Sequence, residues 1–137
     1  SEMCIRDRYN PVYYVKDGTE NVVCLWSYSG EYPIAEIKNA TMDDVLKALG
    51  QEQGDLAYFT TLAKQTVPDM TPINSLRAKL PDAQVWTYTY KSLVGMLTVT
   101  DPAGKTAYYD YDSFGRLTGM RDNDGSTIQS FDYHYKQ

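Results

Sequence analysis

The last third of the chain repeats itself, and this repeat limits what the chain can fold into. The residue pairs that lie 21 positions apart are Tyr90 and Tyr111, Asp101 and Asp122, and Gly104 and Gly125. A third unit begins at Phe131. A period of about 20 residues or more is typical of stacked units, because one unit alone cannot bury its apolar face. We therefore expect the chain to be a piece of a longer repetitive protein.

Alternating aromatic and polar residues within each unit predict β-strands with one buried face. This period of two runs through Tyr88-Thr89-Tyr90 and Tyr109-Asp110-Tyr111, and both Tyr and Thr favour pleated strands. Gly104 and Gly125 close turn sequences and can take a positive φ at a hairpin. Gly115 marks a second turn. Each repeat is therefore predicted to contain about two short strands and two tight turns.

The segment from Tyr109 to Thr118, with the sequence YDYDSFGRLT, resembles the YD repeat of RHS-repeat proteins. The family pattern is roughly Tyr-x-Tyr-Asp-x-x-Gly-Arg-Leu, followed by a variable stretch and a Gly-centred turn. The preceding unit departs from it, since Lys91 replaces the Asp and Met96 replaces the Arg. The resemblance covers about residues 85–137. Residues 9–83 resemble, more loosely, segments upstream of such repeats in large bacterial surface proteins, notably of Bacteroides-like organisms.

The resemblance implies a structural role without enzymatic activity or a cofactor. In the family, the sheets coil into a large hollow shell, and some members enclose a C-terminal toxin that is delivered to competing cells. The implied partners are flanking YD repeats of the same parent chain and an enclosed toxin, and the parent is expected at the bacterial cell surface or secreted. The residues implied to pack the repeat are Tyr109, Tyr111, Asp112, Gly115, Arg116, Leu117 and Gly125.

The sequence upstream of the repeat predicts strands followed by helices. Residues 9–40 form the predicted β-region, with strands at Pro11–Val15, Val22–Tyr28 and Tyr32–Lys38. Residues 41–81 switch to a helical period. The predicted helices run over 42–49 with Thr41 as N-cap, over about 55–65, and from Thr71 to Leu80 with Pro72 at the first helical position. The predicted fold class is α+β, with antiparallel hairpin repeats over 84–137 and an inserted segment of two to three helices.

Charge and composition narrow the function further. The net charge is −5, and Lys and Arg do not cluster, which disfavours nucleic-acid binding. No run of 18 apolar residues exists, so no membrane-spanning helix is expected in this fragment. Residues 1–8, SEMCIRDR, resemble a translated sequencing-adaptor remnant and are predicted to be non-native. On this interpretation Cys24 stands alone, and no internal disulfide is expected.

Residues that could carry catalysis are better explained as structure. His134 is the only histidine, and no Gly-x-Ser-x-Gly elbow accompanies it, so a half-exposed strand position is favoured. Glu31 and Glu36 could pair as in a glycosidase, but the sequence does not fix their separation. Asn39-Ala40-Thr41 fits a glycosylation acceptor, although Thr41 is better explained as a helix cap.

Four aspartates in the repeat suggest a calcium site, and turns explain them better. The aspartates are Asp110, Asp112, Asp122 and Asp124. Phe114 stands where an oxygen ligand is needed, and Arg121 stands in place of the bidentate Glu. The segment 101–104 resembles the Asp-Pro-x-Gly motif that precedes self-cleavage in some RHS shells. Here it lies inside the repeat series and is followed by Lys105 instead of Leu, so autoproteolysis is disfavoured.

Aromatic side chains supply the alternative function. Trp26, Trp86 and Tyr88 are candidates for stacking on sugar rings, and RHS-type repeats are sometimes linked with carbohydrate binding. The same side chains could instead pack within the sheet and brace their neighbours across strands. The alternative to a shell or scaffold is therefore a carbohydrate-binding module on the cell surface.

Overall fold

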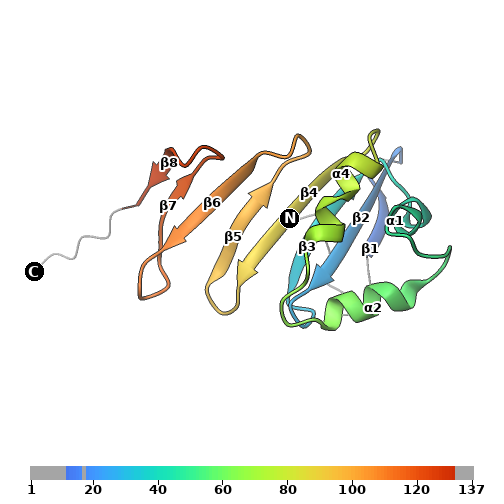
Figure 1. The fold of residues 1–137 in the computed structure, drawn as a ribbon, viewed down its shortest axis with the longest axis horizontal. Coiled ribbons are helices and arrows are strands. Elements are labelled where there is room, and N and C mark those ends of the chain that lie inside the picture. Colours follow the sequence, from blue (N-terminus) through green and yellow to red (C-terminus); the bar gives the residue numbers. More distant parts are fainter. Residues whose placement is uncertain (1–11, 17, 132–137) are drawn as a thin grey trace, which may run out of the picture. The chain divides into compact units, whose positions relative to one another are not determined.

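The computed structural model describes residues 12–16 and 18–131, which form a mostly antiparallel β-structure with helices (Figure 1). The elements are β1 (Val12–Lys16), β2 (Glu20–Ser27), β3 (Tyr32–Lys38), α1 (Met42–Ala48), α2 (Leu56–Lys64), α3 (Thr71–Asn74), α4 (Leu76–Lys79), β4 (Gln84–Lys91), β5 (Gly95–Thr100), β6 (Thr106–Tyr111), β7 (Leu117–Arg121) and β8 (Thr127–Ser130). The predicted α+β class is confirmed. The chain divides into two compact units, residues 1–87 and 88–137, and the division falls within β4.

The first unit combines strands β1 to β4, which are antiparallel neighbours in that order, with all four helices. Strand β2 is buried from Val22 to Ser27, and α2 packs against it. Strand β2 is buried on both faces, since the Ser27 hydroxyl bonds to the Leu62 carbonyl of α2 and the alternate residues Val22, Cys24 and Trp26 form a buried cluster, and its sequence is accordingly a nearly continuous apolar run. The fully buried side chains of the core include Leu25, Ile34, Ile37, Leu46, Ile73, Leu76 and Val85.

Helix α1 begins as its sequence predicts. The Thr41 hydroxyl accepts a hydrogen bond from the Asp44 backbone N–H at 3.2 Å, and the Asp44 carboxylate accepts one from the Thr41 N–H at 2.9 Å. This capping box satisfies two N–H groups that the first turn leaves unpaired.

The third predicted helix is corrected by the structure. In place of one helix from Thr71 to Leu80, two short helices, α3 and α4, lie on either side of Ser75. The Ser75 hydroxyl donates to the Pro72 carbonyl at 2.6 Å. A side chain that binds the backbone in this way competes with regular helical hydrogen bonding, which accounts for the break.

The second unit, within its described residues, consists of strands and tight turns. Strands β5 to β8 pair as successive antiparallel hairpins, and β4 borders β5. Alternation and register give this sheet two faces. The polar face includes Thr98, Tyr108, Asp110 and Arg121, and the apolar face includes Leu97, Val99, Tyr109, Tyr111 and Met120. Every residue of β5 and β6 is only half-buried.

The structure also bears on the expectations for a membrane-spanning helix and for the cysteines. In the part of the chain that the structure describes, no helix is long and apolar enough to cross a membrane. Cys24 is disulfide-bonded, which contradicts the expectation of an unpaired cysteine. That expectation rested on excluding residues 1–8, where the second cysteine, Cys4, lies. Cys4 and His134 fall outside the described residues.

Candidate functional site

Three loops of the second unit are closed by the same set of hydrogen bonds. The loops run over residues 101–105, 112–116 and 122–126. In each loop the Oδ1 of the first residue, an aspartate, accepts hydrogen bonds from the backbone N–H groups two and four positions later, all at 2.9 Å. The aspartate N–H donates to the carbonyl four positions later at 2.8 to 2.9 Å. One carboxylate oxygen thus satisfies two donors at each chain reversal.

The Asp-closed loop recurs every 10 or 11 residues, which is half of the 21-residue repeat in the sequence. Asp101 and Asp122 begin loops at one end of the hairpins, and Asp112 begins the same loop at the other end (Figure 1). The sequence prediction of turns at Asp112 and Asp122 is confirmed. It missed that all three turns are one device, although the shared signal, an Asp three positions before a Gly, was present in the sequence.

A tyrosine of β6 closes the open end of the β5–β6 hairpin. The Tyr111 hydroxyl donates to the Met96 carbonyl at 2.7 Å. A side chain at Gly95 would bring its Cβ within 2.8 Å of that hydroxyl, and Gly95 has a φ of +149°, which only glycine adopts readily. The absence of a side chain at Gly95 therefore admits Tyr111.

An ion pair joins β6 and β7 on the polar face. The Arg121 guanidinium donates to both carboxylate oxygens of Asp110, at 2.8 and 3.0 Å, and lies 5.2 Å from the centre of the Tyr108 ring. This hydrogen bonding holds the pKa of Asp110 below its usual value and raises that of Arg121. Both side chains are about two-fifths exposed, so the pair mainly fixes register and adds little stability.

Arg116 forms the second ion pair of the repeat. Its Nε lies 2.8 Å from the Asp112 Oδ2, and its guanidinium lies 5.3 Å from the centre of the Phe114 ring. Hydrogen bonds from the Arg116 backbone N–H and side chain lower the pKa of Asp112. Arg116 thus pairs with the aspartate that begins its own loop and stacks on the phenylalanine of the same loop.

The segment that contains these loops and ion pairs also matches a known protein family. Residues 94–127 match the family model described as RHS Repeat. The chain carries an RHS repeat. The matched residues include all three Asp-closed loops, together with Tyr111 and both ion pairs. No curated protein and no solved structure matches the chain.

The aromatic candidates for sugar stacking differ in exposure. Trp26 and Tyr88 are 6% and 8% exposed, so neither offers an open ring face, and the expectation of stacking at these two positions is corrected. Trp86 is half-buried. None of the three lies within the RHS match.

Other candidates of the first unit serve structure. Glu36 is buried, with its carboxylate 3.7 Å from the Lys38 ammonium, whereas Glu31 is exposed. The Asn39 side chain donates to the Asp82 carbonyl at 2.9 Å. Within the described residues, no three His, Cys, Asp or Glu side chains are grouped so that they could hold a metal ion.

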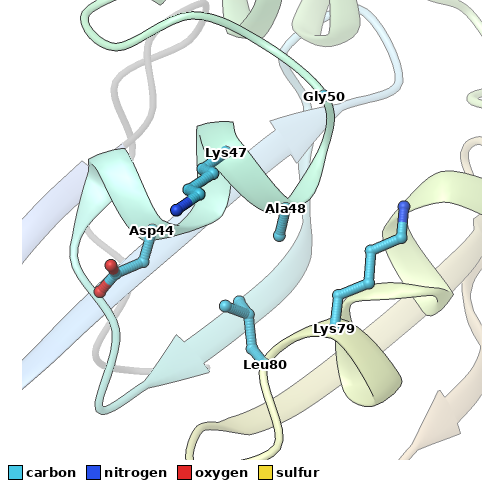
Figure 2. Close-up of a pocket in the computed structure, with 6 residues that line it drawn as sticks. All are labelled: Asp44, Lys47, Ala48, Gly50, Lys79 and Leu80. Atoms are coloured by element: carbon cyan, nitrogen blue, oxygen red, sulfur yellow. The ribbon is translucent and has the colours of Figure 1, made fainter.

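A shallow hollow of about 540 Å³ lies between α1 and α4, outside the RHS match (Figure 2). Its lining residues are Asp44, Lys47, Ala48, Gly50, Lys79 and Leu80. In Figure 2, Ala48 and Leu80 lie between Lys47 on one side and Lys79 on the other. Sequence reasoning missed this hollow, because only the packing of α1 against α4 brings the two lysines to it. Its six lining residues include no Ser, Cys or His.

Proposed function

We propose that the second unit is a non-enzymatic structural segment of a bacterial surface or secreted protein, in which RHS repeats build a β-sheet scaffold. The observation that carries the proposal is the repetition of one Asp-closed loop at both ends of the hairpins. A sheet in which the same turn closure recurs after β5, β6 and β7 can be extended strand by strand, since each new hairpin brings its own turn chemistry.

The side chains of the repeat support a structural role through the bonds they make. The Oδ1 atoms of Asp101, Asp112 and Asp122 are occupied by backbone N–H groups. Asp110 is held by Arg121, and the Tyr111 hydroxyl is held by a backbone carbonyl. General acid–base catalysis needs groups that are free to exchange protons with a substrate. These groups instead fix turns, register and the contact between β5 and β6.

A more specific proposal is that the RHS repeats of the parent protein form a hollow shell. We infer that flanking repeats of the parent chain continue this sheet and that the parent encloses a C-terminal toxin as cargo. The half-buried apolar face of β5 to β7 supports this, because such a face is stabilised when further sheet or cargo covers it.

The experiment begins with the contiguous genomic sequence, followed by expression of the whole reading frame and electron microscopy. A closed particle in which the C-terminal domain resists protease, while the same domain expressed alone is digested, supports the shell. An open strip with a protease-sensitive C-terminal domain refutes enclosure and leaves the scaffold role standing. The same genomic sequence tests whether residues 1–8 and the Bacteroides-like origin are genuine.

The second candidate function is a carbohydrate-binding module. The half-exposed rings of Trp86, Tyr109 and Tyr111 favour it, since an aromatic face can cover the apolar C–H surface of a sugar. A glycan array with the 137-residue chain tests it. Saturable binding that is lost in Trp86→Ala and kept in a Tyr58→Ala control supports the module. An array without saturable binding refutes it.

A further inference from the structure

Two large apolar side chains stand in solvent at one end of the hairpins of the second unit. Leu93 lies in the β4–β5 turn and is 99% exposed, and Phe114 lies in the β6–β7 turn and is 81% exposed. They are 21 residues apart, which is the period of the repeat. Both turns lie at the same end of the hairpins in Figure 1. Two strands separate the turns, so the tips lie about 10 Å apart.

A leucine is unexpected at position 93, because the backbone there has a positive φ. The turn is closed by a hydrogen bond from the Val94 N–H to the Lys91 carbonyl at 3.1 Å, and Leu93, its third residue, has a φ of +65°. This position favours Gly or Asn, because a branched side chain is strained there. Leu93 buries nothing against the fold, so neither the backbone nor the core explains its presence.

The opposite end of the hairpins has a different character. Its turns carry Pro102 and Ala103 in one loop and Asn123 and Asp124 in the other, which are small or polar tips. The large apolar tips are therefore confined to one end of the described hairpins. An apolar feature restricted to one edge indicates that this edge meets something other than water.

Positive charge accompanies each apolar tip. Lys91 is exposed beside Leu93 and has no ion-pair partner among the described residues. The Arg116 guanidinium lies 5.3 Å from the centre of the Phe114 ring, and its charge is shared with Asp112. The Leu93 tip thus combines an apolar side chain with a cation, which is the combination that binds the interface of an anionic membrane, whereas at the Phe114 tip the charge of Arg116 is balanced by Asp112.

We propose that the end of the hairpins formed by Leu93 and Phe114 docks on an anionic lipid surface. A stable interface between proteins needs roughly 800 Å² from each partner, and two isolated side chains offer far less. A lipid surface needs no complementary shape and accepts single apolar tips, while its anionic headgroups attract Lys91. Successive RHS repeats would add further tips along the same edge, which increases avidity.

The experiment is vesicle co-sedimentation of the whole 137-residue chain, with phosphatidylcholine vesicles and with vesicles that also contain phosphatidylserine. We expect binding to the anionic vesicles only, weakened by salt. Leu93→Asn and Phe114→Ser should each reduce the partition coefficient at least tenfold, and Lys91→Gln about fivefold. Leu93→Asn should leave the thermal midpoint unchanged or raise it, because Asn tolerates positive φ.

A matched control lies at the other end of the hairpins. Ala103→Asn changes a turn tip there and should leave vesicle binding unchanged. Equal binding to both kinds of vesicle, no binding to either, or the same loss in Ala103→Asn as in Leu93→Asn would overturn the proposal. If vesicles do not bind, and Leu93→Asn instead abolishes self-association in analytical ultracentrifugation, the partner is a second copy of this chain and the lipid proposal is wrong.

Discussion

Replacing Gly95 by Ala tests the contact between Tyr111 and the start of β5, at the open end of the β5–β6 hairpin. The first cost is in the backbone, because an L-residue at a φ of +149° is strained by about 1–3 kcal/mol. The second is in the contact, since the new Cβ would lie 2.8 Å from the Tyr111 hydroxyl. Moving that hydroxyl breaks its 2.7 Å hydrogen bond to the Met96 carbonyl, which costs about 1 kcal/mol. The total is about 2–4 kcal/mol.

Thermal unfolding followed by tyrosine near-ultraviolet circular dichroism measures this loss, because the second unit is rich in tyrosines. A cost of this size lowers the midpoint by roughly 10 °C in a chain of this length. Tyr111→Phe alone removes only the hydrogen bond and should cost about 1 kcal/mol. Gly104→Ala is the control, since Gly104 also has a positive φ, +85°, but faces open space.

A double-mutant cycle separates the contact from the backbone strain. In the Tyr111→Phe background, Gly95→Ala meets no hydroxyl, so its cost should fall by about 1 kcal/mol. The cost of Gly104→Ala should be the same in both backgrounds. If the effects of Gly95→Ala and Tyr111→Phe simply add, Gly95 is required by its backbone conformation alone and not to admit the Tyr111 hydroxyl.

Three further predictions concern other parts of the chain. Ser27→Ala removes the buried hydroxyl that donates to the Leu62 carbonyl at 2.7 Å, so the free energy of unfolding in urea should fall by about 1–3 kcal/mol; an unchanged denaturation midpoint would contradict this. Because Arg121 lowers the folded-state pKa of Asp110, this pair stabilises the fold above pH 4 and loses its effect as the pH falls through that lowered pKa. Arg121→Met should raise the pKa of Asp110 measured by NMR titration, and a constant pKa would refute the assignment. Thr41→Ala removes half of the capping box, so it should cost about 1 kcal/mol in thermal unfolding, and a Thr41→Ser variant that fails to restore it would argue against the cap.

The elements were predictable where a local rule decides them. The N-cap at Thr41 and the strand at Tyr32–Lys38 follow from short-range patterns, and the structure places both as predicted. The prediction of a single helix from Thr71 to Leu80 was wrong. The hydrophobic period of the sequence contains no information about the hydrogen bond that the Ser75 hydroxyl donates to the backbone. The burial of Trp26 and Tyr88 was not predicted either, because the exposure of a side chain depends on tertiary packing and not on sequence spacing.

The sequence by itself determined the repeat and its turn chemistry. An Asp three positions before a Gly closes a turn through bonds within five residues, so this information is local and readable. Only the tertiary structure decided which side chains meet between neighbouring strands and which face water. Tyr111 reaches Met96 across 15 positions, and Leu93 and Phe114 stand exposed at one end because strand pairing brings their turns there. Contacts of this kind depend on strand register, which is set by the pairing of several strands together and not by any short segment of sequence.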